Sequence, residues 1–257
     1  MSETDRAWAI AAAQARRETG AFSLPDPDMR FARAYALQDH YVANIGAAIG
    51  GYKLAVNGKA LMAHFGVDEP VSARVFAPEI HSGGIELLRP GFIEVSIEPE
   101  LVAVLGSSVA DLDGPVDRDG AIGAIDRFHA GIELIDQRGI AMPDIRLPQA
   151  IALNVFNAGC VLGDGSLAPG ELDIANLHVT LTVDGEIVAE TTGTAPQDPV
   201  DAVMWLINHL VSRGLRPEPG MIVMCGTHLP LYTLAAGAGS VRVAMSGLGS
   251  AGFKLTG

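Results

Sequence analysis

The chain has 257 residues, of which 49% are hydrophobic, so it can bury one large core or two smaller ones. Its formal net charge of −13 and its aromatic content of 5% argue against nucleic-acid binding, which needs a basic surface. The sequence has neither a signal-peptide pattern nor an apolar run long enough to span a bilayer, so we expect a cytoplasmic protein without membrane contact.

The first fifty residues are predicted to be helical. Residues 5–18 are rich in alanine, and Gly20 suits the end of a helix. Residues 29–46 carry apolar side chains at helical spacing, and Gly50-Gly51 is expected to end this second helix.

Short strands are predicted to dominate from residue 52 onward. They are expected at residues 52–56, 92–105, 131–136, 150–162, 220–227, 240–246 and 251–255. Residues 176–191 predict a hairpin, because Asp184-Gly185 stands between two alternating runs. Two helices interrupt the strands, one at residues 119–129 and one that opens with Asp198-Pro199 and runs to about Arg213.

The clearest predicted strand carries acidic residues on one of its faces. In residues 93–101 the apolar and polar side chains alternate, which places Glu98 and Glu100 side by side. Such a pair suits a hard cation such as Mg²⁺ or Mn²⁺, but the same pattern is typical of an ordinary solvated strand face. Pro99 between them is uncommon in a central strand, although its ring would lie on the apolar face.

Glu133 lies within the apolar stretch 131–135. A carboxylate in such a setting needs a partner or a metal ion. A structural ion pair and a functional site are equally compatible with this observation alone.

Seven segments together resemble one enzyme family, and their order and spacing carry the resemblance. They are AYALQ at 34–38, GYKLA at 51–55, FGVDEP at 65–70, IEPELVAVLG at 97–106, GIELID at 131–136, DAVMWL at 201–206 and SGLGSAGFKL at 246–255. The chain resembles the 2-keto-4-pentenoate hydratase and 4-oxalocrotonate decarboxylase group of the fumarylacetoacetate hydrolase-like superfamily.

The resemblance implies an α+β fold in which a helical N-terminal segment precedes a mixed β-sheet roll or partial barrel. We expect residues 1–70 to form the mainly helical region and residues 71–257 to form the catalytic β-roll domain. The resemblance also implies that Glu98, Glu100 and Glu133 hold Mg²⁺ or Mn²⁺, and that Lys53 is a catalytic lysine.

The chain departs from the family pattern around the expected substrate site. Pro78 in FAPEI at 76–80 stands where an acid is expected, so Glu79 is the candidate to replace it. His81 and Thr227 are the candidate substrate contacts. Phe156 replaces a second family acid in Phe156-Asn157-Ala158, and the loop between residues 193 and 198 looks shortened.

The implied activity is hydration of a 2-hydroxy-2,4-dienoate to a 4-hydroxy-2-oxo acid, as in the catabolism of aromatic hydrocarbons by meta-cleavage. A vinylogous 2-oxo acid decarboxylase is the first alternative, followed by a C–C bond hydrolase. A non-catalytic partner subunit is the alternative from another class, because two family acids are missing. We further expect a homo-oligomer, with a decarboxylase or hydratase as a possible partner.

Overall fold

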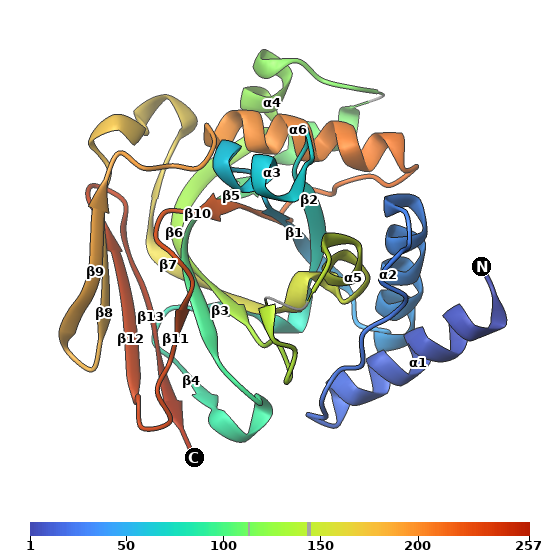
Figure 1. Cartoon of the computed structure of the whole chain (residues 1–257). Helices are drawn as coiled ribbons and strands as arrows, with labels where there is room; N and C mark the ends of the chain where they lie inside the picture. The colour runs from blue at the N-terminus through green and yellow to red at the C-terminus, as the bar shows by residue number, and fades with distance from the viewer. Residues whose placement is uncertain (113, 143–144) are drawn as a thin grey trace.

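The computed structural model describes residues 1–112, 114–142 and 145–257, which form two β-sheets and six α-helices (Figure 1). The helices are α1 (Glu3–Arg17), α2 (Phe31–Ile45), α3 (Lys59–Phe65), α4 (Arg118–Ala124), α5 (Leu147–Ala152) and α6 (Pro199–Ser212). The α+β architecture with a helical beginning and mixed sheets confirms the predicted fold class.

The first sheet curls on itself and builds the functional site. Its strands are β1 (Ile49–Ala55), β2 (Val71–Phe76), β3 (Ile80–Ser82), β5 (Ser96–Leu105), β6 (Ile125–Ile135), β7 (Asn157–Leu167), β10 (Ile222–Thr227) and β11 (Tyr232–Thr233). They follow the order β2-β1-β10-β5-β6-β7-β3, and β11 pairs with β5. The outermost strands β2 and β3 are joined by one short 3₁₀ turn, Ala77–Glu79, so the chain itself connects the two edges of the curl.

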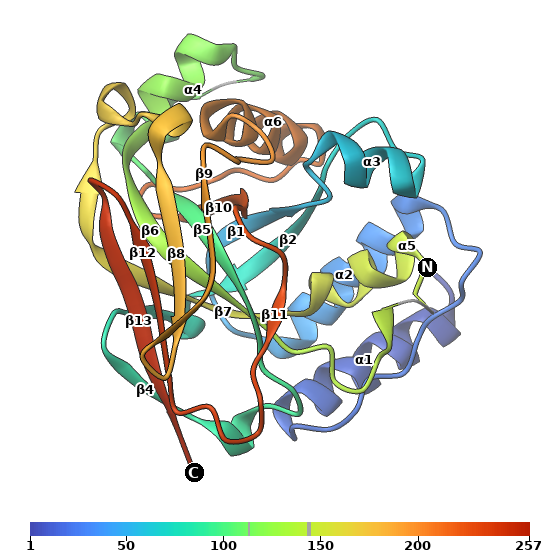
Figure 2. The ribbon, with the colours of Figure 1, turned by 60° about the vertical axis from the view of Figure 1, so that its left-hand side comes forward.

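The second sheet stacks on the outside of the curled sheet (Figures 1 and 2). It consists of β4 (Ile85–Leu88), β8 (His178–Val183), β9 (Glu186–Thr192), β12 (Ser240–Met245) and β13 (Gly249–Thr256), in the order β4-β13-β12-β8-β9. The largest hydrophobic cluster joins Leu101 of β5, Leu181 of β8, Val243 of β12 and Leu206 of α6. This cluster packs against the outer face of the curled sheet, so the inner face of that sheet remains available for the functional site.

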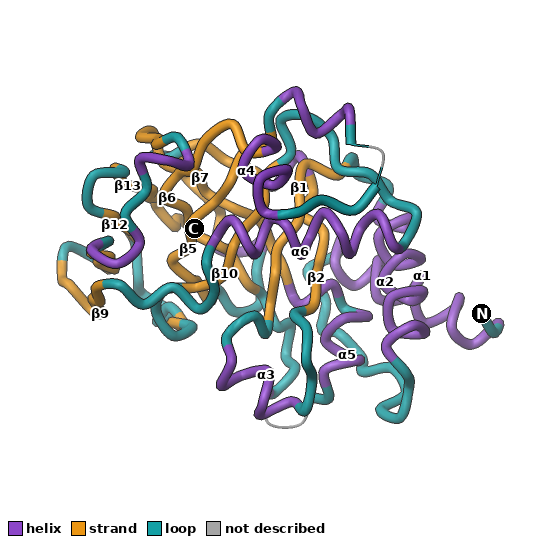
Figure 3. The backbone as a smooth tube through the Cα atoms, turned by 90° about the horizontal axis from the view of Figure 1, so that it is seen from above, coloured by secondary structure: helices purple, strands orange, loops and turns teal. Residues whose placement is uncertain are grey.

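Helices cover parts of the curled sheet that the second sheet leaves uncovered. Figure 1 shows α1 and α2 beside its far edge, and Figure 3 shows α6 crossing the strands from above. Tyr35 and Gln38, both within the AYALQ segment of α2, attach this layer to β2: the Ser72 N–H donates to Tyr35 Oη at 3.1 Å, and Gln38 Nε2 donates to Ser72 O at 3.0 Å. These two motif residues therefore serve packing.

Local signals predicted the hairpin and α6 correctly. Asp184 and Gly185 both have positive φ, 51° and 86°, as a tight two-residue hairpin turn requires. Asp198 accepts hydrogen bonds from the Val200 and Asp201 N–H groups, and Pro199 occupies the first turn of α6. Gly214, just beyond the helix, has a φ of +70°.

Three predicted boundaries were wrong for tertiary reasons. The helix predicted at 119–129 ends at Ala124, because the next residues extend β6 along the whole length of β5. The strand predicted at 150–162 begins only at Asn157, after α5 and a turn. The second helix ends at Ile45, within the predicted range 29–46, and is capped by Gly46, whose φ is +75°; Gly50-Gly51, which was expected to end it, belongs to β1.

Within the described ranges, none of the helices has the length and apolar character needed to cross a bilayer. The proposed division at residue 70 stays a prediction. β1, which belongs to the first of the two predicted regions, pairs with both β2 and β10.

Candidate active site

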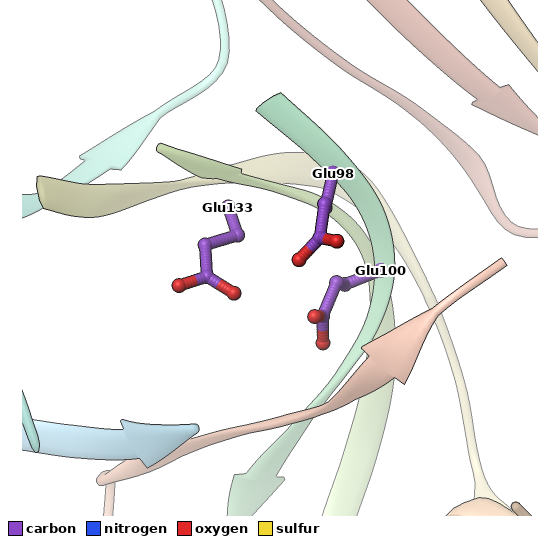
Figure 4. Close-up of side chains that lie close together, drawn as sticks. All are labelled: Glu98, Glu100 and Glu133. Carbon is purple, nitrogen blue, oxygen red and sulfur yellow. The ribbon is translucent and has the colours of Figure 1, made fainter. Parts of the chain in front are cut away.

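Two adjacent strands bring three carboxylates together on the inner face of the curled sheet. Glu98 of β5 lies directly opposite Glu133 of β6 in the antiparallel register, and Glu100 lies opposite Gly131. One oxygen from each of the three side chains lies within 4.8 Å of the others. Figure 4 shows the three carboxylates converging on a common point.

This arrangement is electrostatically costly without a cation. Like charges directly opposite in a sheet repel each other, and Glu100 and Glu133 are only 1% and 0% exposed. Burial, reinforced by the Glu133 charge, raises the pKa of Glu98 to about 7. Burial, reinforced by the Glu133 and Glu98 carboxylates, also raises the pKa of Glu100.

Lys53 on β1 supplies one compensating charge. Its side chain is 2% exposed, and Nζ donates to Glu133 Oε1 at 2.5 Å. Burial alone would lower the pKa of Lys53, but the Glu133 and Glu98 carboxylates outweigh it and leave the pKa raised. One ammonium group balances one of three carboxylates, so the cluster retains a capacity for further positive charge.

Asn157 at the start of β7 fixes the orientation of Glu133. Its Nδ2 donates to the same Oε1 at 3.0 Å, whereas Glu133 Oε2 is buried and has no hydrogen-bonding partner among the described residues. An unpartnered buried carboxylate oxygen is costly unless a ligand binds it. Among the described residues, Glu133 therefore has one oxygen that is already hydrogen-bonded and a second oxygen that is available to a ligand.

Gly226 of β10 orients Glu100 in a similar way. The pairing of β10 with β5 is interrupted between Met224 and Thr227, and within this bulge the Gly226 N–H donates to Glu100 Oε2 at 2.7 Å. The backbone there has a φ of +109°, which favours glycine.

The same irregularity explains Pro99. The His228 N–H donates to Pro99 O at 2.9 Å, so the Pro99 backbone faces the gap between the β10 and β11 pairings. A residue without an N–H is tolerated where the ladder is already broken.

An unusual turn forms another wall. Asn154, Val155 and Phe156 have successive φ values of 54°, 47° and 56°, a left-handed conformation that β-branched and bulky residues rarely adopt. The Asn154 side chain holds the turn through two 2.8 Å bonds to the backbone of Arg74. The turn lets Val155 O accept a hydrogen bond from Lys53 Nζ at 3.4 Å.

Several of these groups line one end of a cavity of about 380 Å³. Its lining includes Lys53, Glu98, Glu100, Thr227 and Gly226 at the charged end. The remaining lining is mostly apolar and comes from α3, α5 and the segments beside them. A cavity that is mostly apolar and has a few convergent polar groups is typical of a small-molecule site.

Not every predicted site residue reaches this cavity. Thr227 lines it, with its hydroxyl donating to Leu229 O at 2.5 Å. Glu79 is not among the described lining residues and instead pairs with Arg16 at 2.6 Å. His81 lies on β3 opposite Val161 and likewise does not line the cavity. The structure thus brings Lys53, the three glutamates and Thr227 together, and leaves Glu79 and His81 outside.

Three contributors to the site escaped sequence reasoning. Asn157 and the Gly226 N–H act through hydrogen bonds that depend on tertiary register. Asn157 lies in Phe156-Asn157-Ala158, already noted as a departure from the family pattern, and Gly226 lies in the predicted strand 220–227. The left-handed turn at residues 154–156 has no sequence signal, because none of its residues is a glycine.

The donor set fits a hard divalent cation. Carboxylate oxygens are the preferred ligands of Mg²⁺ and Mn²⁺, and three of them leave positions for substrate oxygens. Such an ion would give Glu133 Oε2 a partner and would offset the repulsion between the facing Glu98 and Glu133 carboxylates. Glu98, Glu100 and Glu133 therefore fit the group that the sequence predicts.

Comparison with known proteins agrees with this geometry. Residues 59–256 match the family model described as fumarylacetoacetate (FAA) hydrolase C-terminal. The chain is 31% identical over 263 residues to a 2-keto-4-pentenoate hydratase of Paraburkholderia phymatum, covering 97% of each chain. It is 30% identical to a 2-oxo-hept-4-ene-1,7-dioate hydratase of Escherichia coli, covering 82% of each.

A solved structure shares the fold. The 4-oxalocrotonate decarboxylase of Pseudomonas putida G7, complexed with magnesium and adipate, superposes with a TM-score of 0.87 at 24% identity and covers 98% of this chain and 97% of its own. Together these findings support a divalent-metal site. The chain belongs to the fumarylacetoacetate hydrolase family, and within it to the metal-dependent enzymes that include the 2-keto-4-pentenoate hydratases and 4-oxalocrotonate decarboxylases.

Proposed function

We propose that the protein is a hydratase that converts a 2-hydroxy-2,4-dienoate and water into a 4-hydroxy-2-oxo acid, with Mg²⁺ or Mn²⁺ held by Glu98, Glu100 and Glu133. The observation that carries the proposal is the convergence of three carboxylates beside the buried ammonium of Lys53 at one end of a mostly apolar cavity. The hydratase relatives at about 30% identity support the reaction type.

When bound, the ion would supply Lewis-acid stabilisation of negative charge on the 2-oxygen of the substrate. Glu98, Glu100 and Glu133 would orient the ion and, through it, the carboxylate end of the substrate. The apolar lining keeps bulk water away from the diene, so that protons move between chosen groups.

Lys53 is the group that we assign to proton transfer. In the first half of the reaction, the 2-hydroxyl loses its proton and carbon 5 gains one, which gives the 2-oxo-3-enoate. In the second half, water adds its hydroxyl to carbon 4 and a proton is added to carbon 3. Lys53 can give and regain the proton in each half, because it lines the cavity and Glu133 favours its protonated state.

Glu79 is left out of these transfers, because it pairs with Arg16 away from the cavity lining. Thr227 lines the charged end, and we propose that its hydroxyl oxygen accepts a hydrogen bond from substrate or from the attacking water. A cytoplasmic location, a homo-oligomer and a decarboxylase or hydratase partner remain predictions.

The test follows the loss of dienol absorbance when purified protein and Mg²⁺ are mixed with 2-hydroxypenta-2,4-dienoate. We expect turnover that falls about 10²- to 10⁴-fold in Lys53→Met, the typical contribution of one proton-transfer group. Turnover in the matched variant Lys59→Met, which changes an exposed lysine, should equal that of the wild type.

No turnover by protein that binds the metal would refute the hydratase assignment. Release of CO₂ from 2-oxohex-3-enedioate, without hydration of the dienoate, would instead identify a decarboxylase.

A further inference from the structure

The cavity is strongly asymmetric, and its uncharged end has no assigned role. One end carries Lys53, Glu98 and Glu100, while most of the remaining lining is hydrocarbon, with Asn57 and Gln137 as uncharged polar side chains. The apolar set comprises Leu61 and Phe65 of α3, Met142, Ile145, and Leu147 and Ala150 of α5. With the 2-oxo acid group held at the charged end, this end would lie against the part of a substrate that is remote from its carboxylate.

A second carboxylate at that remote end would find no cation. Among the described lining residues, Lys53 alone is cationic, and its Nζ already contacts Glu133. Lys59, Arg138 and Arg146 are neighbours of lining residues along the chain, but none of them lines the cavity. Lys59 and Arg146 are exposed, and Arg138 is buried beside Asp136. The residues outside the described ranges are Asp113, Pro143 and Asp144, none of which is basic.

The mouth of the cavity also favours hydrocarbon. Leu61 and Met142 are 46% exposed although they line the cavity, and α3 buries none of its side chains fully. An apolar tail reaching this mouth would cover exposed hydrocarbon and gain affinity, whereas a carboxylate there would lose water without gaining a cationic partner.

The volume indicates a tail longer than that of the five-carbon dienoate. At roughly 30 Å³ per water-sized group, 380 Å³ holds about twelve such groups, whereas 2-hydroxypenta-2,4-dienoate has only about eight non-hydrogen atoms. After an ion and one water are allowed for, about two more carbon atoms fit.

We propose that the cavity selects 2-oxo and 2-hydroxy acids with one carboxylate and an uncharged hydrocarbon tail of about seven carbons in all, and that it discriminates against acids with a second, terminal carboxylate. The inference rests on the proposed function, because it takes the three-glutamate end as the end that holds the 2-oxo acid group. It separates this chain from those relatives whose names specify a dioate.

Calorimetric titration in Mg²⁺ with unreactive saturated acids provides the test. Each additional buried methylene contributes about fourfold in affinity, so 2-oxoheptanoate should bind about 15-fold more tightly than 2-oxopentanoate. The matched diacid 2-oxoheptanedioate should bind at least about tenfold more weakly than 2-oxoheptanoate. Equal or tighter binding of the diacid would overturn the inference.

A pair of variants locates the discrimination. Leu61→Arg places a cation at the mouth and should raise the affinity for the diacid relative to the monoacid by about tenfold or more. Ile122→Arg makes the same change at a similarly exposed residue of α4 that does not line the cavity, and should leave the ratio unchanged. If both variants shift the ratio equally, the mouth does not determine selectivity.

The kinetic counterpart compares the hydration of 2-hydroxyhepta-2,4-dienoate with that of 2-hydroxyhepta-2,4-diene-1,7-dioate. The monoacid should have the higher kcat/KM. Failure to hydrate either dienoate, with the monoacid preference in binding retained, would refute the proposed reaction but support the assigned substrate class. Hydration of both dienoates with a preference for the dioate would support the proposed reaction but refute the assigned substrate class.

Discussion

Replacing Lys53 by methionine removes the only ammonium group in contact with the carboxylate cluster among the described residues, while roughly conserving the volume of the side chain. Lys53 and Glu133 are buried and joined at 2.5 Å, so Glu133 would lose its charged partner in a buried environment. Removing one partner of a buried ion pair destabilises proteins by about 3–5 kcal/mol. We expect a loss of this size in the free energy of unfolding when divalent metal is removed with a chelator.

Saturating Mg²⁺ should reverse much of that loss. In Lys53→Met the three carboxylates no longer interact with a resident ammonium, so a divalent ion gains more by binding to them. An ion at about 100 times its Kd stabilises the folded state by about 2.7 kcal/mol, and tighter binding adds to this amount. The increment from Mg²⁺ should therefore be larger in the variant than in the wild type.

Urea denaturation followed by circular dichroism, with chelator or with excess Mg²⁺, measures both effects. Lys59→Met is the matched control, since it removes an exposed lysine outside the cluster. The reasoning would be refuted if Lys53→Met without metal were within about 1 kcal/mol of the wild type, or if Mg²⁺ stabilised both proteins equally.

Three further predictions follow from the structure. Gly226→Ala should lower the free energy of unfolding by about 1–3 kcal/mol, because the φ of Gly226 is +109°. It should also weaken Mn²⁺ binding, because the Gly226 N–H orients Glu100. Urea denaturation and Mn²⁺ titration measure the two effects, and Gly237→Ala is the control, since a Cβ at Gly237 would meet open space. Burial lowers the pKa of His228 to about 4, so the unfolded chain takes up its proton first and stability should fall as the pH drops from about 6.5 towards 4. For this histidine, the free energy of unfolding changes by at most about 1.4 kcal/mol per pH unit. Urea denaturation curves recorded at a series of pH values should show a smaller pH dependence in His228→Leu. Asp198→Ala removes the cap of α6 and should cost about 1 kcal/mol, visible as a lower urea midpoint with an unchanged slope.

The parts of the fold with strong local signals were predictable from the sequence. The hairpin required only the turn at Asp184-Gly185, and α6 required only its cap and its apolar spacing. The first half of β6 was predicted as helix, because its strand conformation comes from pairing with β5 rather than from its own residues.

The candidate site also has parts that local sequence patterns predict and parts that depend on tertiary structure. Alternation along β5 was sufficient to place Glu98 beside Glu100, but it could not distinguish a solvated face from the interior of a curled sheet. The position of Glu133 opposite Glu98 depends on strand register, and the contact of Lys53 with Glu133 depends on the curvature of the sheet. The apolar end of the cavity is assembled from α3, α5 and a connecting segment, whose approach no local pattern indicates.

The most direct test of the account is a Mn²⁺ titration of the wild type and two variants, followed by electron paramagnetic resonance. The wild type should bind one ion per chain, and Glu133→Gln should weaken that binding by at least about 100-fold, because it removes the charge of a proposed ligand. Glu94→Gln is the control, since Glu94 is exposed and lies just before β5. Equal affinity of the wild type and Glu133→Gln would contradict a metal site formed by the three glutamates.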